Sequence, residues 1–146
     1  MASYSQSKVC FFFESVKPTL RHRTELKQFI ESIFRKERKA LKHLNYVFCT
    51  DNQLLQINRD YLKHNYFTDI ISFDLSETSL VMEGEIYISI DRVRDNASDH
   101  LVSFNSELHR VIFHGALHLC GYKDKLKEDK IKMRAMENKY LAMYLK

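Results

Sequence analysis

Few residues in this 146-residue sequence interrupt regular structure, because it contains only one proline and three glycines. Proline and glycine are the main breakers of helices and strands, so we expect mostly regular elements joined by short loops. No apolar run approaches the roughly 18 residues that a membrane-spanning helix needs. The N-terminal segment MASYSQSK also lacks the charged region and apolar run of a secretory signal. These absences argue against a membrane or secreted protein.

Cysteine is scarce as well, with only Cys10, Cys49 and Cys120 in the chain. Their number is odd and they are widely spaced, which does not suit a framework of disulfides. We interpret them as reduced, partly buried thiols in a reducing compartment. Together with the missing signal, this predicts a cytoplasmic protein.

What the sequence does contain is enough apolar material for a core. Hydrophobic residues make up 45% of the chain and aromatic residues 12%, which excludes a disordered protein. The length is that of one folded unit, and no linker, repeat or low-complexity stretch divides it. We therefore assign residues 1–146 to a single domain.

The charge is spread unevenly. The net charge of +4 comes from 23 basic and 19 acidic residues, and residues 1–42 hold ten of the basic and four of the acidic ones. A basic region of this kind favours an anionic partner such as RNA. A solvated, lysine-rich helix face is the alternative, and charge alone favours it.

Hydrophobic periodicity indicates an α+β fold with helices around one small sheet. Four strands are predicted, over residues 9–13, 45–50, 69–74 and 85–90, and the segment before the last of them is expected to be a turn ending at Gly84. Five helices are predicted: one beginning near Leu20, one capped by Asp51, one capped by Asp91, one capped by Ser103 or Asn105, and one from about Leu126.

The predicted helix with Ser103 or Asn105 as its cap has a well-defined apolar face. Its members recur at helical spacing: Phe104, Leu108, Val111, Ile112, Gly115 and Leu119. Gly121 follows where a helix-terminating glycine belongs. Because Gly115 lies on the apolar face, we expect another element to approach the helix closely there.

The end of this helix carries the pattern HGALHLCGYKD, in which His114, His118 and Asp124 predict a metal site. Histidines four residues apart on a helix project from one face and can bind one zinc ion. Gly121 then turns the chain so that Asp124 becomes the third ligand, as in the H-x-x-x-H-x-x-G-x-x-(H/D) spacing of metzincin-like sites. Three protein ligands leave one coordination position open, which is typical of a catalytic site. The predicted cofactor is one divalent ion, zinc, although Fe²⁺ and Mn²⁺ also suit this ligand set.

The same pattern argues against proteolysis. Metalloproteases with an HExxH helix place a general base directly after the first histidine, and Gly115 holds that position here. The group that takes the proton stays open between a carboxylate such as Glu85, a substrate oxygen and a second metal-bound water. Glu128 and Asp129 are alternative ligands, but only Asp124 has the expected spacing.

At these residues the sequence resembles the YbeY-type endoribonucleases. HGALHLCGYKD is similar to the family signature H-G-x-L-H-L-x-G-Y-D-H, and INRDYLKHNYFTDIISFDL, from Ile57, resembles L-N-x-x-Y-R-x-x-x-x-P-T-D-V-L-S-F. Gly84-Glu85-Ile86 is close to the family's G-D-I. The three matches follow one another in the right order between about residues 50 and 140.

The resemblance implies a four-stranded mixed sheet, a zinc ion on the long helix, and single-stranded RNA as the substrate, in rRNA maturation and ribosome quality control. It carries the metal ligands onto His114 and His118, whereas Asp124 stands where the family has histidine. The family's arginine falls on Leu62, so Arg59 or Lys63 are the candidates to supply the missing positive charge.

Three functions follow as hypotheses. The first is a metal-dependent endoribonuclease whose partners are single-stranded RNA, rRNA and the ribosome, with no nucleotide cofactor. The second is a metallohydrolase acting on another bond, such as an amide. The third is a non-catalytic RNA- or ribosome-binding factor in which the metal is structural.

Overall fold

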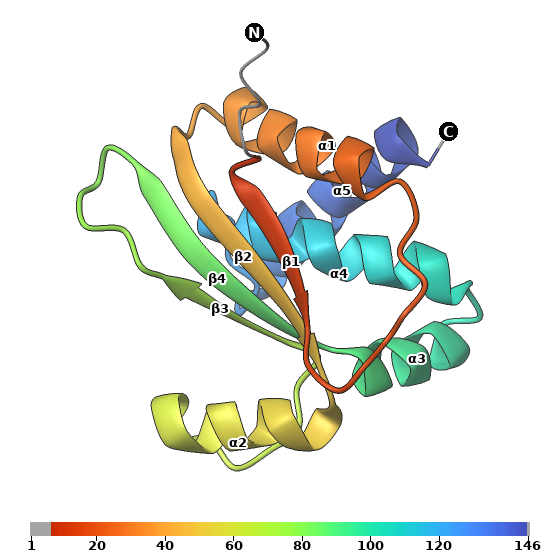
Figure 1. Ribbon diagram of the computed structural model, residues 1–146. Coiled ribbons are helices and arrows are strands. Elements are labelled where there is room, and N and C mark those ends of the chain that lie inside the picture. The colour runs from red at the N-terminus through yellow and green to blue at the C-terminus, as the bar shows by residue number, and fades with distance from the viewer. Residues whose placement is uncertain (1–6, 146) are drawn as a thin grey trace, which may run out of the picture.

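The computed structural model describes residues 7–145 and has one four-stranded sheet with helices on both of its faces (Figure 1). The elements follow in the order β1 (Val9–Phe13), α1 (Arg23–Lys36), β2 (Leu41–Cys49), α2 (Asp51–Leu62), β3 (Ile70–Asp74), β4 (Met82–Ser89), α3 (Ile90–Asp99), α4 (Phe104–Leu119) and α5 (Lys127–Tyr144). The predicted α+β class is confirmed.

The sheet is mixed, as the resemblance implied. Its strand order is β1-β2-β4-β3. β1 and β4 each run parallel to β2, and β3 is antiparallel to β4. This order leaves β3 as one edge strand, and the chain enters it from α2 through residues 63–69.

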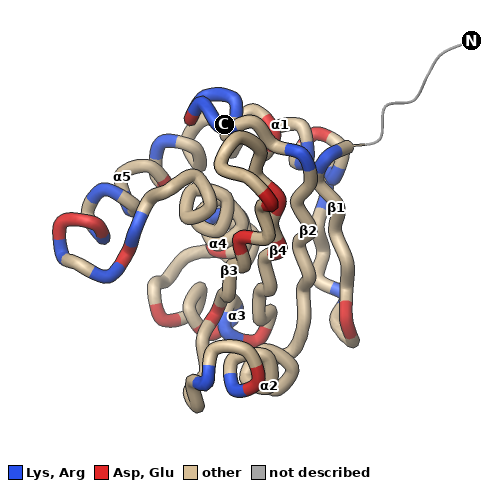
Figure 2. Tube along the Cα trace, turned by 90° about the vertical axis from the view of Figure 1, so that its left-hand side faces the viewer, with Lys and Arg blue, Asp and Glu red and all other residues tan. Residues whose placement is uncertain are grey.

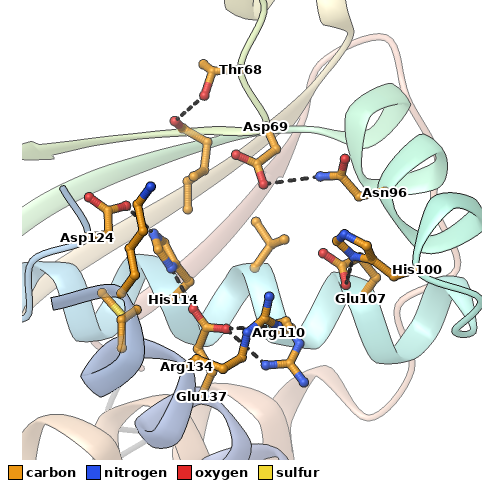
Figure 3. A pocket seen from close by; sticks show the side chains of 14 residues that line it. Thr68, Asp69, Asn96, His100, Glu107, Arg110, His114, Asp124, Arg134 and Glu137 are labelled. Carbon is orange, nitrogen blue, oxygen red and sulfur yellow. Dashed lines mark hydrogen bonds and ion pairs between the residues drawn. The ribbon is translucent and has the colours of Figure 1, made fainter. Parts of the chain in front are cut away.

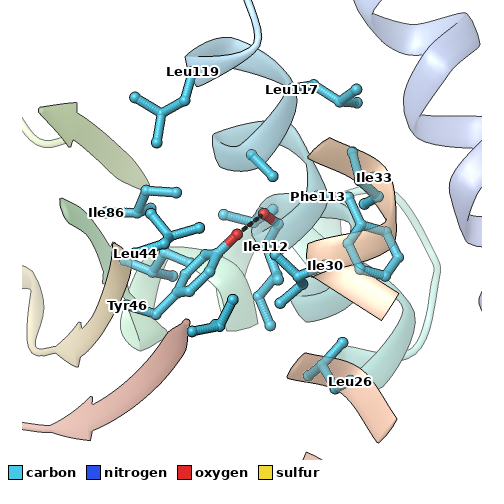
Figure 4. Close-up of a cluster of buried hydrophobic side chains, with 14 of the residues drawn as sticks. Leu26, Ile30, Ile33, Leu44, Tyr46, Ile86, Ile112, Phe113, Leu117 and Leu119 are labelled. Carbon is cyan, nitrogen blue, oxygen red and sulfur yellow. Dashed lines mark hydrogen bonds between the residues drawn. The ribbon is translucent and has the colours of Figure 1, made fainter. Parts of the chain in front are cut away.

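Two apolar clusters cover the two faces of the sheet. The larger one joins α1, α4 and α5 to the inner strand residues, and Tyr46, Phe113 and Tyr140 are among its fully buried side chains (Figure 4). The hydroxyl of Tyr46 donates a hydrogen bond of 2.8 Å to the carbonyl of Ile112, which fixes α4 to β2. The smaller cluster lies beneath α2 around Leu54 and Ile71. α4 is thus held rigidly in the core, and a site on its remaining face has a firm support.

Element boundaries differ from the predicted ones where side chains form local hydrogen bonds. α2 is capped by Thr50, whose hydroxyl accepts from the backbone N–H of Gln53 in a capping box, and not by Asp51. α3 is capped by Ser89, and not by Asp91. Asp51 instead binds Arg92 of α3, with an N–O distance of 3.0 Å. Ser103 caps α4 as predicted.

Three elements also begin elsewhere than predicted. α1 begins at Arg23, because His22 adopts a left-handed conformation with φ of 54°. β2 begins at Leu41 and β4 at Met82, so both strands extend further toward the N-terminus. Gly84 therefore lies inside a strand. A Cβ atom there would be 2.7 Å from Leu119 Cδ1, so this glycine serves the packing of α4 rather than a turn.

Gly115 is the position where α4 comes closest to the sheet, as expected. A Cβ atom at this position would be 2.9 Å from Ile86 Cδ1 and 3.0 Å from Ile70 Cδ1. These isoleucines belong to β4 and β3. The close approach therefore brings the preceding residue on the helix, His114, near the β3 edge of the sheet.

Gly115→Ala is expected to lower the free energy of unfolding by about 1–2 kcal/mol. Overpacking costs about 1–3 kcal/mol, and the gain in helix propensity returns up to about 1 kcal/mol. Denaturant unfolding measures the change. The Ile86→Val change removes the nearest methyl group, so the double variant should lose less stability than the two single variants added together. A rise in stability on Gly115→Ala alone contradicts the close-approach explanation.

Candidate metal centre

The outer face of α4 borders an open cleft of about 430 Å³ (Figure 3). The opposite walls come from the start of β3, from α3, and from α5 with the turn that precedes it. The polar side chains that line the cleft are Thr68, Asp69, Asn96, His100, Glu107, Arg110, His114, Asp124, Lys130, Arg134 and Glu137. Its volume lies in the range of small-ligand sites.

His114 is the residue around which one end of the cleft is organised. Its Nδ1 lies 2.7 Å from Glu137 Oε2 of α5, and its Nε2 lies 3.3 Å from Asp124 Oδ2. Glu137 is buried, whereas Asp124 is partly open to solvent. The structure therefore brings His114 and Asp124 together, and a carboxylate that the sequence analysis did not include holds the imidazole from behind.

His118 lies one helical turn further along the same face. Its ring is parallel to that of His114, with an interplanar angle of 3° and ring centroids 6.4 Å apart. Its Nδ1 lies 3.1 Å from the carbonyl oxygen of Tyr122. This carbonyl can reach back because Gly121 turns the chain with φ of 110°, as predicted for the end of the helix.

As placed, these side chains do not enclose an ion. Within residues 7–145, no group of three or more His, Cys, Asp and Glu side chains is close enough to hold a metal. His114 and Asp124 are in contact, and His118 is the member that stands apart. The three-ligand set stays a prediction.

The chemistry of the donors nevertheless fits a metal such as zinc. In both histidines Nδ1 has a hydrogen-bond acceptor, Glu137 for His114 and the Tyr122 carbonyl for His118. An imidazole that donates from Nδ1 keeps its lone pair on Nε2, which is the usual arrangement of metal-ligating histidines. Asp124 adds a hard oxygen ligand beside His114 Nε2.

The protonation of this pair follows from its surroundings. Burial lowers the pKa of His114, but the hydrogen bond and charge of Glu137, with the charges of Asp124 and Asp69, outweigh burial and raise it. Burial also acts to raise the pKa of Glu137, yet hydrogen bonds from His114 and Arg110 bring it below its ordinary value. Without a metal, the pair therefore favours an imidazolium facing a carboxylate. A metal ion bound at Nε2 of His114 would take the place of the proton that the imidazolium carries on this nitrogen.

The candidate catalytic residues named from the sequence do not line this cleft. Arg59 is exposed on α2, and Lys63 is exposed directly after the end of that helix. Both bind nearby residues, since Arg59 Nε donates to Asn65 Oδ1 and Lys63 Nζ to the carbonyl of Asp60. Glu85 accepts a hydrogen bond from Tyr87, on the face of the sheet that α2 covers. It is thus on the opposite face from α4.

Other charged residues take their place. Arg110, Lys130 and Arg134 line the cleft, and Arg110 Nη1 binds Glu137 Oε1 at 3.0 Å. Asp69 lies across the cleft from α4, where burial raises its pKa and Asn96 donates to it at 3.4 Å. Asp69 is part of the TDIISFD stretch that resembles the family motif, which was a usable signal. Nothing local in the sequence singled out Glu137.

Figure 2 shows that basic positions are spread over several segments of the chain. They occur on α1 and near the start of β2, and along α5 they alternate with acidic ones. None of the described residues that line the cleft belongs to residues 1–42, which carry the excess of positive charge. In the part of the chain that the structure describes, no helix has the length and apolarity to cross a membrane.

These features define a small α+β protein with a histidine- and carboxylate-lined cleft beside its longest buried helix. The chain belongs to the YbeY family, whose family model is described as endoribonuclease YbeY and matches residues 13–145. This confirms the family that the sequence motifs indicated.

Curated relatives and a solved structure agree with this assignment. The chain is 48% identical to an endoribonuclease YbeY of Cytophaga hutchinsonii, over 94% of this chain and 96% of the relative. It is 44% identical to an endoribonuclease YbeY of Porphyromonas gingivalis, over 94% and 90%. A solution structure of a Thermotoga maritima protein is similar with a TM-score of 0.62 and 26% identity, covering 91% of this chain and 86% of that one.

Proposed function

We propose that this protein is a metal-dependent endoribonuclease that cleaves single-stranded RNA in rRNA maturation and ribosome quality control in the cytoplasm. The relatives named endoribonuclease, which match nearly the whole chain, support the reaction. The observation that carries the metal dependence is the contact between His114 Nε2 and Asp124 Oδ2, with Glu137 behind the imidazole.

His114, His118 and Asp124 would hold the ion, and zinc is the metal proposed. When bound, a divalent ion supplies an acidified water and charge stabilisation for hydrolysis of a phosphodiester. Of the three, His118 is the exposed one, and the Tyr122 carbonyl beside its Nδ1 leaves Nε2 available to the ion.

The remaining chemistry belongs to the side chains of the cleft. Glu137 accepts a hydrogen bond from the Nδ1–H of His114 and so keeps Nε2 directed into the cleft. Lys130 and Arg134 lie on α5 at its rim and are exposed, so they can bind the phosphates on either side of the scissile bond. Arg110 is partly buried and anchored to Glu137, which suits it to stabilise a charge developing on the phosphate rather than to capture RNA.

Cleavage assays with labelled RNA test this proposal. We expect the protein to cleave a single-stranded oligonucleotide, to stop when a chelator removes the metal, and to resume when zinc is restored. A peptide or amide substrate should not be cleaved. RNA binding that persists in the chelated protein, without any cleavage at any metal loading, would identify a non-catalytic binding factor instead.

A further inference from the structure

Glu107 is a buried carboxylate for which the fold gives no reason. Its side chain is 6% exposed, lines the cleft and points into it (Figure 3). It accepts no hydrogen bond from residues 7–145, and its ion-pair partner is His100, at 4.0 Å. Arg110, the nearest basic residue on its own helix, is bound to Glu137 instead.

Such an arrangement is unfavourable for the protein alone. A carboxylate buried to this extent loses much of its hydration and, without donors, recovers little. Its oxygens still reach the open cleft, since they are not among the fully buried side-chain atoms that lack a partner. Burial accordingly raises the pKa of Glu107, and the positive charges of His100, Arg110 and Arg134 offset this only in part. A leucine or glutamine at this position would serve the packing better. The carboxylate therefore has the character of a group held ready for a ligand that brings its own donors.

The position of Glu107 relates it to the candidate metal centre. Glu107 and His114 lie seven residues apart on α4, on the same face and about 10 Å apart along the helix axis. This is comparable to the span from a phosphate, through its ribose, to the far edge of a purine. Asp69 and Asn96 lie between and opposite them, joined by a hydrogen bond. We call Glu107, His100, Asn96 and Asp69 the distal end of the cleft.

We propose that the distal end of the cleft is a nucleobase subsite that binds guanine next to the scissile phosphate, with Glu107 accepting hydrogen bonds from the base. This inference rests on the proposed ribonuclease function. An ionised carboxylate offers two acceptors side by side, and guanine presents two adjacent donors, N1–H and the N2 amino group. Adenine and cytosine present one amino group next to an acceptor, which would face a carboxylate oxygen unfavourably.

The neighbouring groups fit a base rather than a cation. His100 is half-exposed, so its ring is available to stack on a base, as aromatic side chains do in single-strand recognition. Arg110 and His100 beside Glu107 lower the attraction of this end for a second metal ion. Asn96 offers an amide, which can donate to and accept from a base edge.

Binding of mononucleotides tests the subsite without requiring cleavage. Guanosine and inosine 5′-monophosphates share their phosphate and differ only in the N2 amino group, so their difference isolates one donor. We expect guanosine monophosphate to bind the wild-type protein about tenfold more tightly than the inosine or adenosine nucleotide, with NMR shifts at α3 and the first turns of α4. This comparison needs no variant. Equal affinities would overturn the proposal.

The Glu107→Gln variant provides the second part of the test. Glutamine has nearly the same shape as glutamate, so we expect the variant to unfold at the same or a higher temperature and to lose the preference for guanosine monophosphate. Glu77→Gln, an exposed carboxylate in the loop before β4, is the matched control and should keep the preference. A preference that survives Glu107→Gln contradicts the role of this residue. Shifts at Glu107 produced by Mg²⁺ or Zn²⁺ but by no nucleotide would identify a cation site and also overturn the proposal.

Cleavage of matched oligonucleotides separates this inference from the function on which it rests. Substituting inosine for the guanine at one position should raise KM with a smaller effect on kcat, and only in the wild-type and Glu77→Gln proteins. Cleavage without such a dependence would leave the ribonuclease proposal standing and remove the subsite. A preference for guanosine monophosphate without cleavage of RNA would leave the subsite standing and remove the ribonuclease proposal.

Discussion

Replacing Glu137 by leucine is expected to lower the free energy of unfolding by about 3–5 kcal/mol, the range found when one partner of a buried ion pair is removed. Glu137 is 8% exposed and binds both His114, at 2.7 Å, and Arg110, at 3.0 Å. Its loss leaves these two groups in the cleft wall without their carboxylate, and Arg134 loses its contact with Glu137 at 3.6 Å as well. Chemical unfolding of the metal-free protein measures the effect.

The same change should weaken zinc binding. Residues that hold a ligating histidine from behind contribute about 10–100-fold to metal affinity. Glu137→Gln keeps an acceptor for the Nδ1 proton but loses the charge, so it should fall between wild type and Glu137→Leu in both measurements. Glu128→Leu, at an exposed position in the first turn of the same helix, is the control. Wild-type stability and zinc affinity in Glu137→Leu would show that His114 does not depend on this partner.

The importance of Glu137 could not be read from the chain, and the reason is physical. The sequence spacing of His114, His118, Gly121 and Asp124 is local, so helix geometry and one glycine turn are enough to bring His114 and Asp124 together. Glu137 reaches His114 only because α5 packs across α4. Its stripe on α5, with Met133 and Tyr140, is buried, and a carboxylate within such a stripe is a signal of a partner across the interface.

The element boundaries also divide into those that local sequence patterns predict and those that they do not. Hydrophobic periodicity was sufficient for the four strands and five helices, and for the closeness of α4 to the sheet at Gly115. It failed at the starts of α2 and α3, where Thr50 and Ser89 compete successfully with Asp51 and Asp91 for the capping position. It also failed at Gly84, where the packing of Leu119, a residue distant in sequence, is the reason for a glycine inside a strand.

The charged residues that line the cleft could not be predicted from the sequence for a different reason. Glu85, Arg59 and Lys63 were selected for their nearness in sequence to family motifs, but period-two alternation along β4 directs Glu85 to the α2 face. Arg59 belongs to α2, which covers that same face, and Lys63 follows directly after this helix. The charges that do line the cleft, Arg110 and Arg134 among them, come from α4 and α5 and carry no motif.

Asp124→Ala is expected to reduce RNA cleavage by roughly 10²–10³-fold, because losing a proposed ligand weakens the hold on the ion that would stabilise the developing charge. The contact of 3.3 Å between Asp124 Oδ2 and His114 Nε2 places this carboxylate beside the nitrogen that is proposed to bind the ion. RNA affinity should change little, because removing one anion does not remove the basic residues of the cleft rim. Cleavage and binding are measured on the same labelled oligonucleotide.

Asp124→His separates the role of a ligand from the role of a charge. Histidine stands at this position in the family pattern, so this variant should retain zinc and stay within about tenfold of wild-type cleavage, an energy difference of about 1.4 kcal/mol. It replaces an anionic ligand by a neutral one, which leaves more positive charge on the site and should acidify the bound water further. The pH dependence of cleavage should therefore move to lower pH. Activity lost equally in Asp124→Ala and Asp124→His, with zinc retained in both, would mean that Asp124 acts on the substrate and is not a ligand.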